Sequence, residues 1–114
     1  MGLLNAEAIK ASPPKMVKVP VPEWGGADAF VMVRGMSGTL RFAFDDRGAS
    51  HADEDFRARL AAFTLCDESG SLLFTPDSIP SLSHVDFAAL DRVFKVAVEL
   101  NKLSKVNIDD FEKN

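Results

Sequence analysis

The alternation of apolar and polar positions near the start of the chain predicts a β-hairpin. Residues 15–22 alternate three valines with other side chains, which is the period of a strand, and the two prolines there confine that strand to the edge of a sheet. Residues 30–33, with the sequence FVMV, predict a second strand. Residues 23–26, which include two glycines, predict the turn that joins the pair.

Helical spacing predicts two shorter helices. Residues 5–10 form a short one, in which Asn5 is a plausible cap. A helix over 52–65 is predicted by a buried stripe at the spacing i, i+4 and i+7, formed by Phe56, Leu60 and Phe63. Ser50 and Asp53 have the spacing of a capping box at its start. A turn at 67–71, a short extended piece at 72–74 and one helical turn at 76–79 follow.

Residues 36–48 are compatible with two structures. Leu40, Phe42 and Phe44 alternate with polar or small residues, as in a strand, whereas Ser37 has the character of a cap for a helix running to Asp46. Periodicity alone does not decide between them.

The strongest predicted element is a long helix over 84–103. Ser83 and Asp86 have capping-box spacing, and Leu82 and Phe87 have the spacing of a hydrophobic staple. Its apolar residues fill an arc of roughly 220° at 100° per residue, which is wider than one packing surface needs. The helix is therefore either the centre of its own domain or partly a surface for a partner. The arc consists of Leu90, Val93, Phe94, Val96, Ala97, Val98 and Leu100.

Composition narrows the class of protein. The chain has 114 residues, the size of one domain, and 46% of them are hydrophobic, enough for a core. The formal net charge is −4 and the 13 Lys and Arg residues are scattered, which argues against nucleic acid or an anionic membrane as the main ligand. A single cysteine, no basic start and no long apolar run lead us to expect a cytoplasmic protein.

The residues that could serve catalysis or metal binding have simpler structural explanations. His51 and His84 have no second ligand at metal-binding spacing, and Cys66 ends an amphipathic helix, where a small buried side chain is expected. The acidic pairs and runs fall in turns or first helical turns, where acids stabilise helix ends. We therefore expect no enzyme activity, no cofactor and no metal site. Trp24 is either a core residue or an exposed anchor for a partner.

Taken in order, several segments resemble the tail assembly chaperones of long-tailed bacteriophages and prophages. The resemblance covers about residues 5–114, and it rests on the order and spacing of these segments and not on any single motif. Residues 38–48 depart from the pattern, because relatives have an acidic, alanine-rich helix there. The matching segments are VPVPEWGG at 19–26, VMVR at 31–34, RARLAAFTLCDESG at 57–70, LFT at 73–75, AAL at 88–90 and LNKL at 100–103.

The resemblance implies a function. Such chaperones bind the long tape-measure protein, keep it soluble, help tail-tube subunits assemble around it and leave before the virion is complete. Many relatives also have a longer form made by ribosomal frameshifting. Glu112, Lys113 and Asn114 can be encoded with the slippery heptamer A AAA AAC, and the codons of the gene would test this hypothesis.

We therefore expect one α+β domain over 1–114, mostly helical, with a small N-terminal β-hairpin, a long C-terminal helix and a polar, flexible tail at 104–114. The expected partners are the tape-measure and tail-tube proteins, together with self-association that hides the same surface. The alternative is a structural tail-completion or head–tail connector component of the virion. The candidate partner-binding residues are Trp24, Phe87, Val93, Val96 and Leu100.

Overall fold

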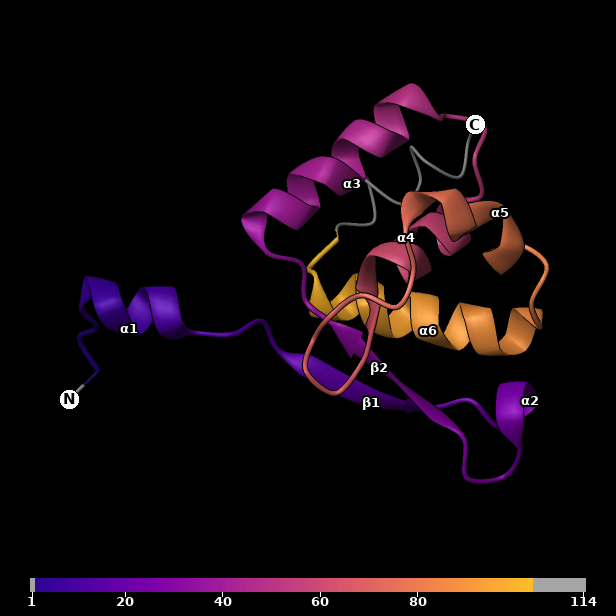
Figure 1. Ribbon diagram of the computed structural model, residues 1–114, viewed down its shortest axis with the longest axis horizontal. Coiled ribbons are helices and arrows are strands. Elements are labelled where there is room, and N and C mark those ends of the chain that lie inside the picture. The colour runs from indigo at the N-terminus through magenta and orange to yellow at the C-terminus, as the bar shows by residue number, and fades with distance from the viewer. Residues whose placement is uncertain (1, 104–114) are drawn as a thin grey trace.

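Helices pack against a small antiparallel sheet in this computed structural model, which describes residues 2–103 (Figure 1). β1 (Met16–Pro20) pairs with β2 (Phe30–Arg34), and β2 pairs with the short β3 (Leu65–Cys66), in the order β1-β2-β3. The register places Val17 opposite Val33 and Val19 opposite Val31, so four valines share one face of the hairpin. The α+β class, the hairpin and the edge position of β1 are as predicted.

The helical elements of the described chain are mostly short, and their bounds are as follows: α1 (Ala6–Ala11), α2 (Pro22–Gly25), α3 (Gly38–Ser50), α4 (Phe56–Thr64), the 3₁₀ turn η1 (Pro76–Ser78), α5 (Ile79–Leu82) and α6 (Phe87–Leu100).

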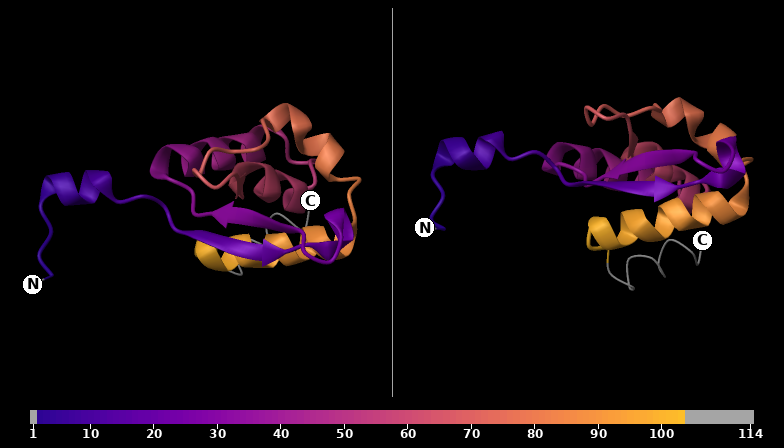
Figure 2. Two further views of the ribbon diagram at one scale, coloured as in Figure 1. Left: turned by 60° about the horizontal axis from the view of Figure 1, so that its bottom comes forward. Right: turned by 90° about the horizontal axis from the view of Figure 1, so that it is seen from below.

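The core forms around α4, every residue of which except Arg57 is buried. Figure 2 shows α6 running beside the hairpin, and its inner face packs between the hairpin and α4. Aromatic rings join the helices: Phe56 of α4 lies 5.9 Å from Phe44 of α3 and 5.6 Å from Phe94 of α6, measured between ring centroids. One apolar cluster thus holds the sheet, α3, α4 and α6 together.

The segment 36–48, which sequence periodicity left open, is helical. Ser37 caps α3 by accepting a hydrogen bond from the Leu40 N–H at 3.2 Å. A strand would place Phe42 and Phe44 on the same face, but in the helix Phe44 is fully buried and Phe42 is 75% exposed. The α3 helix therefore anchors itself on the core through Phe44.

The predicted starts of two helices are wrong. α4 begins at Phe56 because Asp55 caps it by accepting from the Arg57 and Ala58 N–H groups, while Ser50 belongs to α3. α6 begins at Phe87 because Asp86 is its cap and accepts from the Ala89 N–H at 3.2 Å. At α6 the acid of the predicted capping box, Asp86, precedes the helix and caps it. At α4 the cap is Asp55, two residues after the Asp53 of the predicted box.

Three smaller predictions, for the staple of α6, the turn of the hairpin and the first helix, can also be compared with the structure. With Asp86 as cap, the staple positions of α6 are Val85 and Leu90, so Leu82 and Phe87 do not form the predicted staple. The predicted turn at 23–26 contains one turn of helix, α2, over residues 22–25. The short helix at the start is confirmed, with Asn5 accepting from the Ala8 N–H at 2.9 Å. The tail at 104–114 lies outside the described residues.

Candidate partner-binding groove

A groove of about 430 Å³ lies between β1 and the C-terminal half of α6. Three aliphatic side chains line it: Val17 from β1, and Val96 and Leu100 from α6. Lys15, Glu99 and Lys102 complete the lining. We call this set of six residues the β1–α6 groove; it combines an apolar floor with a charged rim.

The wide apolar arc of α6 explains how this groove arises. Val93 and Ala97, four residues apart on one face, are fully buried in the core. Val96 and Leu100, also four residues apart, lie on the neighbouring face and are half-buried. One part of the arc therefore packs in the core, while the adjoining part forms the floor of the groove.

The C-terminal end of α6 carries a strained residue on the groove rim. The Leu103 N–H donates to the Val98 carbonyl at 3.1 Å and the Lys102 N–H to the Glu99 carbonyl at 3.3 Å, which is a Schellman ending. Lys102 takes the left-handed position of this ending, with φ of 55°, where glycine is usual. Backbone strain of this kind, here beside an apolar groove, clusters at functional sites.

Asn101 fixes this end of the helix to the sheet. Its Oδ1 accepts the Met36 N–H at 2.6 Å, and its Nδ2 donates to the Ala97 carbonyl at 3.0 Å. These bonds hold the chain that leaves β2 against the last turn of α6. A second hollow of about 260 Å³, which shares Lys15, Leu100 and Lys102 with the groove, lies beside this junction.

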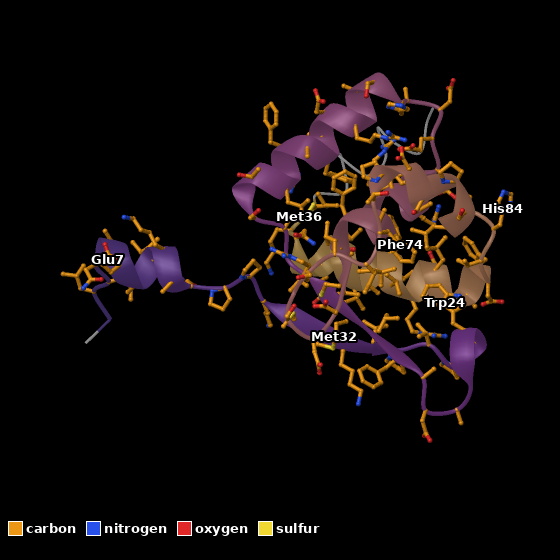
Figure 3. The ribbon with its side chains drawn as sticks, in the orientation of Figure 1. Glu7, Trp24, Met32, Met36, Phe74 and His84 are labelled. Carbon is orange, nitrogen blue, oxygen red and sulfur yellow. The ribbon has the colours of Figure 1, made fainter. Side chains whose placement is uncertain are left out.

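Trp24 lies in a separate hollow of about 140 Å³. The indole is half-buried against the core, on the side of Phe74, which Figure 3 labels. Six further apolar residues line the same hollow: Val31, Leu65, Leu73, Phe74, Leu82 and Val85. Its Nε1–H is buried and has no acceptor among residues 2–103. Trp24 therefore packs on the core, as one of the two predicted roles requires, and it also lines an apolar depression.

The helical turn that carries Trp24 is held by an ion pair to α6. Both guanidinium NH groups of Arg92 donate to the Glu23 carboxylate, at 3.0 and 2.7 Å, and Arg92 also donates to the Pro20 carbonyl at 2.9 Å. The hydrogen bonds from Arg92 lower the pKa of Glu23 from 4.5 to about 2. The motif VPEWGG thus fastens the hairpin loop to α6.

Phe87 and Val93 lie apart from the groove. Phe87 begins α6 and is 62% exposed, with the Arg57 guanidinium 5.5 Å from its ring centroid. It is nine residues from Val96, which turns it to about the opposite side of the helix. Val93 has no exposed surface, so it cannot contact a partner while the domain keeps this fold. Of the five predicted residues, the structure brings together Val96 and Leu100.

The groove residues that the sequence did not single out are Lys15, Val17, Glu99 and Lys102. The alternation of the valines places Val17 on the same face of β1 as buried Val19, so the sequence could have predicted that Val17 faces the domain. The three charged residues look like any solvated side chains in the sequence, and only the approach of β1 to α6 makes them a rim.

The residues examined for chemistry have structural roles. The Asp67 carboxylate accepts from the Ser69 hydroxyl at 2.7 Å and from the Ser69 and Ser71 N–H groups at 2.8 and 3.1 Å. These bonds hold the turn and lower the pKa of Asp67. Cys66 is buried as predicted, and burial raises the pKa of its thiol. Within residues 2–103, no three His, Cys, Asp or Glu side chains gather as metal ligands would. None of the helices over this range combines the length and apolarity needed to cross a membrane.

Comparisons with known proteins address the fold. No family model matches the sequence, and no curated protein matches it. Among solved structures, that of the bacteriophage HK97 tail assembly chaperone is similar, with a TM-score of 0.59 and 19% sequence identity. The match covers 82% of this chain and 94% of that chain. The chain shares its fold with a phage tail assembly chaperone.

Proposed function

We propose that this protein is a phage tail assembly chaperone that binds the tape-measure protein, keeps it soluble and promotes assembly of the tail tube around it. The observation that carries the proposal is the fold likeness to the HK97 chaperone, which extends over 94% of that chain. The ordered sequence segments that resemble the chaperone family support it independently of the structure.

The β1–α6 groove is the surface we assign to the tape-measure protein. Its aliphatic floor fits the apolar stripe of an amphipathic helix, whose side chains at i, i+3, i+4 and i+7 anchor in such grooves. The rim charges of Lys15, Glu99 and Lys102 would pair with the polar flanks of that helix and set its orientation. Such an interface covers an aggregation-prone stripe and still releases it when tube subunits arrive.

The test is co-expression of the tape-measure protein with variants of the chain. Val96→Lys and Leu100→Lys introduce charge into the groove floor, while the lysine stem preserves part of the packing. Val96 and Leu100 are already half-buried, so a partner covers only the rest of each side chain. Burying an unpaired charge in an apolar contact costs more than the lost contact, so either substitution should lower affinity by roughly tenfold or more. We expect the soluble fraction of the tape-measure protein to fall accordingly.

Phe42→Lys is the matched control, because Phe42 is 75% exposed on α3 and does not line the groove. Circular dichroism and thermal denaturation verify that each variant remains folded. Folded groove variants that solubilise the tape-measure protein as well as the wild type would refute the groove assignment. Detection of the chain in purified virions would favour the alternative, a structural tail-completion or head–tail connector protein.

A further inference from the structure

An N-terminal arm, residues 2–11, carries apolar side chains that the domain does not bury. In Figure 1 its helix, α1, stands away from the rest of the molecule. No residue of α1 is buried, and Leu3, Leu4 and Ile9 are 89%, 63% and 60% exposed. The helix is nevertheless well defined by its cap at Asn5, with Leu4 and Ile9 at the two positions of a hydrophobic staple. Such a cluster costs free energy in water unless something covers it.

The β1–α6 groove is the complementary surface, and it lies at the root of the same arm. Lys15, which lines the groove, is four residues beyond the end of α1. The groove has an aliphatic floor for Leu4 and Ile9, and its rim offers Lys15, Lys102 and Glu99 as opposite charges for Glu7 and Lys10 of the arm.

The linker prevents the arm from filling the groove of its own chain. To do so, the chain would have to reverse direction within residues 12–14, whose sequence is Ser-Pro-Pro. Ser12 and Pro13 each precede a proline, which holds them in extended conformations, and Ser12 has φ of −75° and ψ of 114°. An extended linker of this kind directs the arm outward, toward a neighbouring molecule.

From this geometry we infer that two copies of the chain exchange arms, so that α1 of each copy occupies the β1–α6 groove of the other. The groove lies beside the point where the arm joins the domain. If these points of two copies lie next to each other across a two-fold axis, each arm can fill the groove of the other copy. The exchange is therefore reciprocal and closes as a dimer, whereas a groove far from the root would lead to an open chain of molecules. If the groove also binds the tape-measure protein, the arm covers it until that partner arrives.

The first test measures the oligomeric state of the purified chain by sedimentation velocity over a concentration series. The wild type should dimerise, and the double variant Leu4→Ser/Ile9→Ser should raise the dimer dissociation constant at least about tenfold, because both floor contacts are lost. The two substitutions should not unfold the domain, because no residue of α1 is buried in the core, so a change in the dissociation constant reports on the arm itself. Phe42→Ser, which removes another exposed apolar side chain, should leave the dimer intact.

The second test locates the arm. A tagged Ile9→Cys chain is mixed with an untagged Lys102→Cys chain and treated with a short bismaleimide. A tagged product of two chains is expected, and an Ile9→Cys with Phe42→Cys mixture should give far less of it. The proposal is overturned if the wild type is monomeric, if the arm variant dimerises as tightly as the wild type, or if an Ile9→Cys/Lys102→Cys double variant cross-links within one chain. None of these outcomes depends on tape-measure binding, so the proposed function is judged separately.

Discussion

At the scale of single residues, three polar side chains maintain the fold. Glu23, Asp67 and Asn101 each use their side-chain oxygens to join segments that the sequence separates or to close a turn. All three lie in segments that resemble the chaperone family. The segments that carry the resemblance therefore include polar residues that hold loops and turns in place.

The Glu23–Arg92 pair makes stability depend on pH. The pKa of Glu23 is about 2 in the folded chain against a usual 4.5, so its contribution is complete above pH 4.5 and is lost as the pH falls through about 2. Glu23→Gln should therefore be less stable than the wild type at pH 6, with the difference shrinking between pH 4.5 and 2. Urea denaturation at a series of pH values measures this.

Glu7→Gln is the control for that series, because Glu7 lies in the arm, none of whose helical side chains is buried. A Glu23→Gln difference that stays constant from pH 6 to pH 2 would show that the pair does not titrate as described.

At the scale of elements, α3 shows how one residue docks a whole helix. Phe44 is its large buried side chain, and the ring lies 5.6 Å from that of Phe63. Phe42, two positions earlier in the same helix, faces solvent. The two phenylalanines thus offer a matched pair for the contribution of the core to stability.

Phe44→Ala should cost about 3–5 kcal/mol in the free energy of unfolding, because it leaves a cavity between α3 and α4. Phe42→Ala should change that free energy by less than about 0.5 kcal/mol. Chemical denaturation of both variants tests the helical assignment of residues 38–50, since equal losses would indicate that both rings are buried.

At the scale of the whole molecule, the described chain has two parts: a packed domain, and an arm that joins it through Ser12, Pro13 and Pro14. Asn101 ties the domain together across 65 positions of sequence, through its bond to the Met36 N–H. Asn5 makes an equivalent bond in the arm, to the Ala8 N–H. The same kind of hydrogen bond therefore has different consequences in the two parts.

Asn101→Ala should lower the free energy of unfolding by about 1–3 kcal/mol, because it leaves the half-buried Met36 N–H without its acceptor. At protein concentrations too low for arm exchange, Asn5→Ala removes a cap, which weakens α1 but leaves the unfolding transition of the monomeric domain unchanged. Thermal denaturation of the two variants compares them. A common loss of stability would mean that the arm is part of the cooperative domain.

The sequence by itself determined the elements whose signals are local. The valine alternation with its two prolines defined the edge strand of the hairpin, Asn5 defined the first helix, and the apolar arc defined the last one. The turn at 67–71 was also evident from its composition. These features depend on neighbours within a few positions, which a linear pattern records.

The tertiary structure alone decided which face of each element is covered. Residues 38–50 became a helix with Phe44 inward, and the arc of α6 divided between core at Val93 and groove at Val96 and Leu100. Among the acids near the two helix starts, Asp55 and Asp86 are the ones that cap α4 and α6. Burial depends on contacts between segments distant in sequence, so a pattern that marks apolar residues cannot tell which of them the fold leaves open.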